Sequence, residues 1–111
     1  MKGSVLMLSI TLALGTLSAT AAVPTAAQIA AAKTPADHEA LAKAYEVEAK
    51  ALEKMAARHK DLGQTYGQPG GKPWQAGQAK HCDSVASELE AAAKEERALA
   101  EEHAKMAKAA Q

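Results

Sequence analysis

The chain has very few of the residues that build an aromatic or a disulfide-bonded core. Its 111 residues include no Phe, one Trp and one Cys. A single Cys excludes an intramolecular disulfide, so Cys82 is free, bound to a metal ion or paired with another chain. The helical segments hold mostly Ala, Glu and Lys, and because Ala removes much less apolar area from water than Leu, one copy buries little.

An excess of charge and the signature motifs of enzymes are also missing. The 13 basic and 13 acidic residues balance and are mixed along the chain, which argues against a nucleic-acid-binding protein with a basic stripe and against a polybasic membrane-surface helix. There is no His-Glu-x-x-His, no Gly-x-Ser-x-Gly and no phosphate-binding glycine loop. A Cys-x-x-Cys-His sequence for haem attachment is absent. We therefore expect a non-enzymatic protein without haem or nucleic acid.

The N-terminus holds the one long apolar run, at residues 5–17 after Lys2. This run has the length of a signal-peptide core and is too short to cross a membrane comfortably. Ala19 and Ala21 place small residues where a signal peptidase reads them. We expect a signal peptide at 1–21, secretion across the inner membrane into the periplasm, and no membrane span in the mature chain. An uncleaved anchor is the alternative.

The rest of the chain predicts an all-α fold, because its composition is typical of long helices or coiled coils. Residues 22–33 form a lead-in that is either a short helix or loose. Thr34 as N-cap, Pro35 in the first turn and Asp37 predict the start of a helix at 34–62. A long Gly- and Pro-rich loop follows at 63–78, and a second helix at 79–110. The prediction is thus a helical-hairpin domain at 34–111.

The two predicted helices share a heptad phase. Apolar and ligand-type residues recur at its a and d positions: His38, Leu41, Tyr45, Glu48, Leu52, Met55, His59 and Leu62, then Cys82, Val85, Leu89, Ala92, Glu96, Leu99, His103 and Met106. Folded antiparallel, Leu52 meets Leu89, Tyr45 meets Glu96, His59 meets Cys82 and His38 meets His103. One hairpin leaves this stripe half exposed, so we expect a homodimer that forms a four-helix bundle.

Four side chains near the loop suggest a metal site. Met55 and His59 lie one helical turn apart, and His81 and Cys82 are expected opposite them. Two imidazoles, a thiol and a thioether suit copper or zinc. A second, weaker set at the other end comprises His38, His103 and Met106. In the alternative interpretation all of these are ordinary seam and helix-end residues.

Short segments of the chain also resemble a known group. They are Thr-Pro-Ala-Asp-His-Glu-Ala-Leu-Ala at 34–42, Met-Ala-Ala-Arg-His-Lys at 55–60, His-Cys at 81–82 and Ala-Glu-Glu-His-Ala-Lys-Met-Ala at 100–107. With the signal peptide, this order resembles small exported bacterial proteins that are generally described as hypothetical. The resemblance implies a location in the bacterial envelope and an α-helical hairpin, and it implies no activity.

Together these observations predict a non-enzymatic periplasmic binding protein that takes a transition metal ion through His59, His81 and Cys82. The first alternative is a structural or protein-interaction hairpin that binds no metal. The second is a redox sensor that acts through Cys82.

Overall fold

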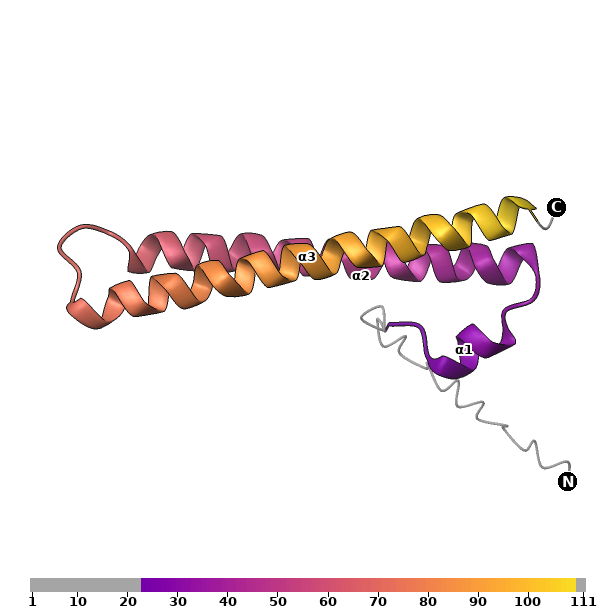
Figure 1. Ribbon diagram of the computed structural model, residues 1–111, viewed down its shortest axis with the longest axis horizontal. Helices are drawn as coiled ribbons and strands as arrows, with labels where there is room; N and C mark the ends of the chain where they lie inside the picture. Colours follow the sequence, from indigo (N-terminus) through magenta and orange to yellow (C-terminus); the bar gives the residue numbers. More distant parts are fainter. Residues whose placement is uncertain (1–22, 110–111) are drawn as a thin grey trace, which may run out of the picture.

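The computed structural model describes residues 23–109, and they form three helices and no strand (Figure 1). Helix α1 covers Ala26–Ala31, α2 covers Pro35–Tyr66 and α3 covers Pro73–Ala109. The two long helices pack side by side and run in opposite directions, and α1 lies beside the start of α2. This confirms the all-α prediction. The predicted signal peptide lies outside the described residues, and none of the described helices is long and apolar enough to span a membrane.

The start of α2 confirms the capping signal in the sequence. The Thr34 hydroxyl accepts a hydrogen bond from the Asp37 backbone N–H at 3.1 Å, and the Asp37 carboxylate accepts from the backbone N–H groups of Thr34 and Lys33, both at 3.0 Å. These donors, Lys33 first, lower the pKa of Asp37, because they stabilise its charged form. Pro35 occupies the first turn, where its missing N–H costs nothing.

The loop between the long helices is shorter than the sequence predicts. The prediction of a loop at 63–78 is wrong at both ends, since α2 continues to Tyr66 and α3 already begins at Pro73. Gly63 does not end the helix but lies buried against α3, where a Cβ would come within 2.7 Å of the Asp83 carboxylate. Pro73 starts a helix because Pro suits the first turn. Among the described residues only Gly70 has a positive φ, at 82°.

Small residues at every seventh position form the buried contact between α2 and α3. Ala49 is fully buried and Ala56 is 1% exposed. The full rows are Ala42, Ala49, Ala56 and Gly63 on α2, and Ala86, Ala93, Ala100 and Ala107 on α3. A side chain of one carbon or none lets two helix backbones approach closely, so the backbones themselves fill the space that Leu fills in most coiled coils.

Of the two rows of residues predicted to lie between the helices on each chain segment, one does so and the other does not. The row of Tyr45, Leu52 and His59 on α2 lies beside the small residues and is buried or half-buried, as is the row of Cys82, Leu89, Glu96 and His103 on α3. The other predicted row turns outward, and its large apolar members are 36–50% exposed, apart from Leu41. The seam is rotated towards the alanines because only they permit the closest approach of the helices.

Three cross-helix contacts fix the register of α2 against α3. The Nδ1 atoms of His38 and His103 lie 3.1 Å apart, which confirms the predicted pairing of these two residues. Arg97 donates two hydrogen bonds to the Glu53 carboxylate, at 2.9 and 2.8 Å, and Lys60 pairs with Glu90. Both ion pairs are about half exposed, so each contributes at most about 1 kcal/mol. These ion pairs therefore align the two helices but contribute little to the free energy of folding.

The alanine rows predict that a larger side chain destabilises the fold at a buried alanine but not at its exposed neighbour. Ala56→Leu should destabilise the fold by about 1–3 kcal/mol, because the extra carbons must force the helices apart. Ala57→Leu is the matched control, since Ala57 is exposed on the same turn and Leu is close to Ala in helix propensity. Urea unfolding followed by circular dichroism measures both. Equal stability of the two variants would contradict the close alanine contact.

Candidate functional site

The residues that turn outward gather on one side of the two long helices. On α2, two rows of residues flank the buried ones on opposite sides. One row comprises residues 39, 46, 53 and 60, and the other comprises residues 41, 48, 55 and 62. The ion pairs Glu53–Arg97 and Lys60–Glu90 join the first row to its counterpart on α3. The second rows of both helices must therefore lie together on the opposite side. We call this side the outer apolar face, with the exposed members Met55, Leu62, Val85, Leu99 and Met106.

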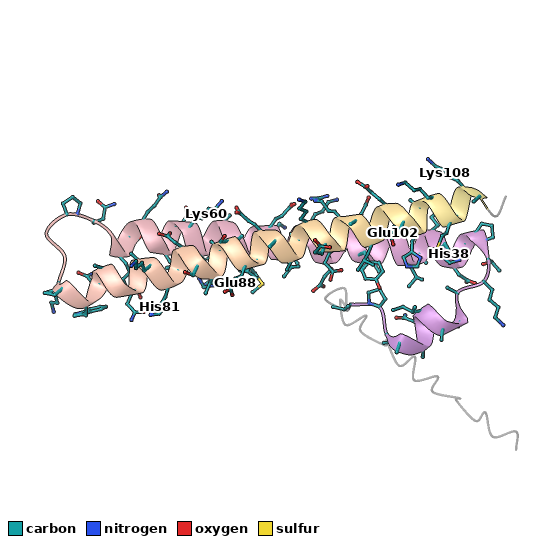
Figure 2. The ribbon with its side chains drawn as sticks, in the orientation of Figure 1. His38, Lys60, His81, Glu88, Glu102 and Lys108 are labelled. Carbon is teal, nitrogen blue, oxygen red and sulfur yellow. The ribbon has the colours of Figure 1, made fainter. Side chains whose placement is uncertain are left out.

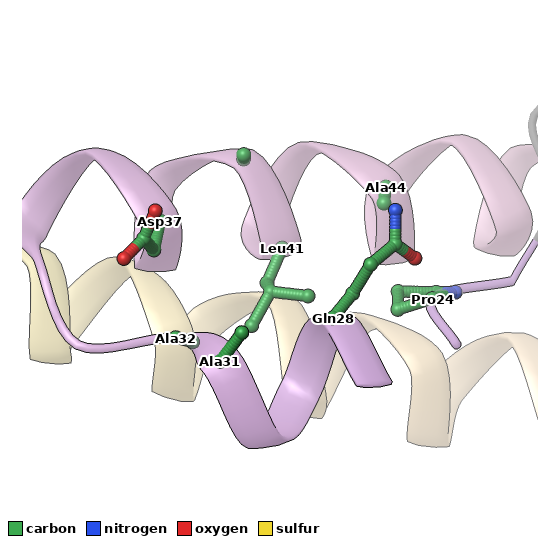
Figure 3. A pocket seen from close by; sticks show the side chains of 8 residues that line it. Pro24, Gln28, Ala31, Ala32, Asp37, Leu41 and Ala44 are labelled. Carbon is green, nitrogen blue, oxygen red and sulfur yellow. The ribbon is translucent and has the colours of Figure 1, made fainter. Parts of the chain in front are cut away.

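Helix α1 covers one end of the outer apolar face. Leu41 belongs to the same row as Met55 but is only 6% exposed. A shallow hollow between α1 and the start of α2 surrounds it, lined by Pro24, Gln28, Ala31, Ala32, Asp37, Ala40, Leu41 and Ala44 (Figure 3). Asp37 is the one ionisable residue in this lining, and its carboxylate is already occupied by backbone donors. The hollow therefore holds no group free for catalysis.

The predicted ligands near the loop do not form a common site. Met55 is half exposed and His81 is exposed, whereas His59 and Cys82 are half-buried. Figure 2 shows His81 near the loop end of α3. Within residues 23–109 no three His, Cys, Asp or Glu side chains gather closely enough to hold a metal ion.

His59 and Cys82 nevertheless lie where α2 and α3 pack closely together. The Nδ1 atom of His59 is buried and has no hydrogen-bond partner. Cys82 is a free thiol whose Cβ would lie 3.4 Å from a Cβ added to Gly63, one turn after His59. Because Gly63 has no side chain, α2 and the half-buried Cys82 of α3 can lie close together here.

The weaker predicted set, at the other end, is the one whose histidines meet. His38 lies near the start of α2 (Figure 2), where its Nδ1 atom approaches that of His103 near the end of α3. The two ring planes are inclined by only 22°. The Tyr45 ring lies nearly parallel to that of His103, at an inclination of 14° and a centroid distance of 5.6 Å. The third predicted member, Met106, is 44% exposed on the outer apolar face.

Two carboxyl groups occupy the middle of the helix pair. One oxygen of Glu96 is buried and accepts no hydrogen bond. Burial raises the pKa of Glu96, and the nearby negative charge of Glu48 raises it further. The sequence predicts that Tyr45 meets Glu96, but the Tyr45 ring instead lies against that of His103.

Comparison with protein-family models, with curated proteins and with solved structures gave no match to this chain. Its function must therefore be argued from its own residues. Sequence reasoning missed the alanine rows, although Ala42, Ala49 and Ala56 recur 44 residues later as Ala86, Ala93 and Ala100. That repeat is the signal that identifies them.

The raised pKa of Glu96 predicts a gain in stability on neutralisation. A carboxyl whose pKa is higher in the folded than in the unfolded state destabilises the fold as pH rises through those values. Glu96→Gln should therefore raise the melting temperature at pH 7, and the difference from the unchanged protein should shrink towards pH 4.

Thermal unfolding at several pH values measures this effect. Glu101→Gln is the control, because Glu101 is exposed on the same helix outside the outer apolar face and should change the melting temperature little. A Glu96→Gln variant that is less stable than the unchanged protein at pH 7 would show that the charged carboxylate has a stabilising partner.

Proposed function

We propose that this chain is an exported, non-enzymatic helical hairpin that acts through protein–protein contact, and that its outer apolar face binds a second copy to form a four-helix bundle. The observation that carries the proposal is the exposure of five large apolar side chains on one side of the helix pair. Scattered apolar residues are common on protein surfaces, but several large ones gathered on one side of a helix pair indicate an interaction surface.

The packing of α2 on α3 explains why this surface remains. The alanine rows take the closest contact, so the longer side chains of Met55, Leu62 and Leu99 cannot enter it. Within residues 23–109, no element other than α1, at Leu41, lies over this single layer of two helices. A second layer of helices is the usual solution for such a stripe.

The size of the face suits a modest, specific interface. A helix of 32 residues is about 48 Å long, and two helices side by side are about 20 Å wide. The whole face therefore spans roughly 960 Å² per copy, and α1 covers its end at Leu41. A dimer through the open part would bury less than roughly 1,900 Å² in total, within the range of stable interfaces.

A second copy of the chain is the occupant that the pattern favours. Both helices contribute an equivalent row, 44 residues apart, so the face is close to self-complementary, as a two-fold interface requires. The edges also match in charge. Row 44/51/58 on α2 carries Arg58, and its counterpart on α3 carries Glu88, Glu95 and Glu102. A two-fold axis along the helices places the Arg58 edge of one copy beside the Glu88 edge of the other.

The carboxyl layer fits this arrangement. Glu48 lies within the outer apolar row and Glu96 lies beside it, so a second copy would enclose both. Buried carboxyl groups must be protonated or paired, and protonated carboxyl groups can hydrogen-bond to one another only where the layers of the two copies lie at the same level. We infer that this layer selects one register of association, as single polar residues do in coiled coils.

Metal binding through Met55, His59, His81 and Cys82 is not part of this proposal. The described structure leaves Met55 and His81 exposed, whereas His59 and Cys82 are half-buried between the helices. The redox alternative is also weaker, because Cys82 lies half-buried against Gly63 rather than on the outer apolar face.

A charge placed on the outer apolar face should abolish self-association. Met55→Glu is expected to shift the protein from dimer to monomer, because two carboxylates would be buried at the interface without partners. Val47→Glu is the matched control, since Val47 is 45% exposed against 50% for Met55 but lies on the side of α2 that faces away from α3.

Analytical ultracentrifugation over a range of concentrations measures the oligomeric state of both variants. Circular dichroism confirms that each remains helical. A monomer at all concentrations for the unchanged protein, or equal loss of the dimer in both variants, would contradict the proposal.

A further inference from the structure

We propose that His38 and His103 bind one divalent transition metal ion of the zinc or copper class through their Nδ1 atoms. The inference does not depend on dimerisation, because both ligands belong to one chain. It starts from a contact that brings two imidazoles together from residues 65 positions apart in the sequence.

The distance between the two nitrogens suits metal coordination. Zinc–nitrogen bonds of 2.0–2.1 Å place two ligand nitrogens about 3.3 Å apart in a tetrahedral site and about 2.9 Å apart at a right angle. The observed Nδ1–Nδ1 distance of 3.1 Å lies between these values. An ion could therefore bind with little movement of α2 or α3.

The surroundings hold the two rings in place. The contact is partly buried, and Tyr45 lies nearly parallel to His103. His38 lies one turn after the Thr34 cap, which anchors the start of α2. Rings that are already positioned lose less freedom when they bind an ion, so even two ligands can give useful affinity.

The remaining coordination positions are open. No third His, Cys, Asp or Glu of the described part of the chain joins the pair. Met106 follows His103 by three residues on the same helix and could offer its thioether, which would favour copper. Water fills the other positions in a zinc complex. The site is thus one of moderate affinity with room for an exchangeable ligand.

The competing explanation for this distance is an ordinary N–H···N hydrogen bond between the two rings. Both Nδ1 atoms cannot carry protons at this distance, so one must accept what the other donates. Metal binding replaces that proton, and its affinity must fall as the pH falls. The experiment can therefore separate a metal site from a hydrogen-bonded pair.

The test is calorimetric titration of the full chain, freed of metal with a chelator, with Zn²⁺ and with Cu²⁺ at pH 7.5. We expect one ion per chain and a melting temperature that rises with metal concentration. His38→Asn and His103→Asn should each weaken binding at least tenfold. His81→Gln is the control and should bind as the unchanged protein does, because His81 is exposed near the other end.

A spectroscopic readout keeps the test independent of folding effects. In ¹⁵N-labelled protein, Zn²⁺ should shift the Nδ1 resonances of His38 and His103 and leave those of His59 and His81 unchanged. Equal binding by all the variants would overturn the proposal in favour of adventitious ions. Absence of any Zn²⁺ or Cu²⁺ binding, with a proton detected between the two rings, would overturn it in favour of the hydrogen bond.

Discussion

The close contact between two rows of small residues determines the rest of this structure. Ala49, Ala56, Ala86 and Ala93 are at most 2% exposed, and no larger side chain of the described chain is buried as completely. Each alanine buries little area, so the contact is stabilised by many short-range interactions along two helices rather than by a few large side chains. Because the seam has no room for Leu or Met, those side chains are directed to the surface, and the outer apolar face follows from the alanine contact.

The same contact explains where the titratable groups lie. Long polar side chains beside a narrow seam either reach solvent, as Arg97 and Glu53 do, or remain partly enclosed, as Glu96 and His59 do. At the free end of the pair, two such enclosed side chains meet as His38 and His103. The candidate metal pair and the carboxyl layer are thus both consequences of how closely the helices approach.

Sequence reasoning correctly predicts the features that depend on local signals and on heptad phase. The Thr34 cap follows from neighbouring residues, and the meeting of His38 with His103 follows from the heptad phase that the two antiparallel helices share. It fails where packing decides. A ranking by hydrophobicity places Met55 and Leu99 in the seam, whereas the distance between backbones selects Ala56 and Ala93. The prediction that the helix ends at Gly63 is wrong for the same reason, because this glycine lets α3 approach α2 closely and does not end the helix.

The seven-residue spacing of the alanine rows restricts how the chain can change in length. Each added or lost residue within α2 or α3 turns all following side chains by about 100°, which would remove every later alanine from the contact. Insertions within the long helices are therefore compatible with the fold mainly as whole heptads placed at matching levels in both. The segment between Tyr66 and Pro73 is free of this requirement, so natural variants of this chain should vary in length there.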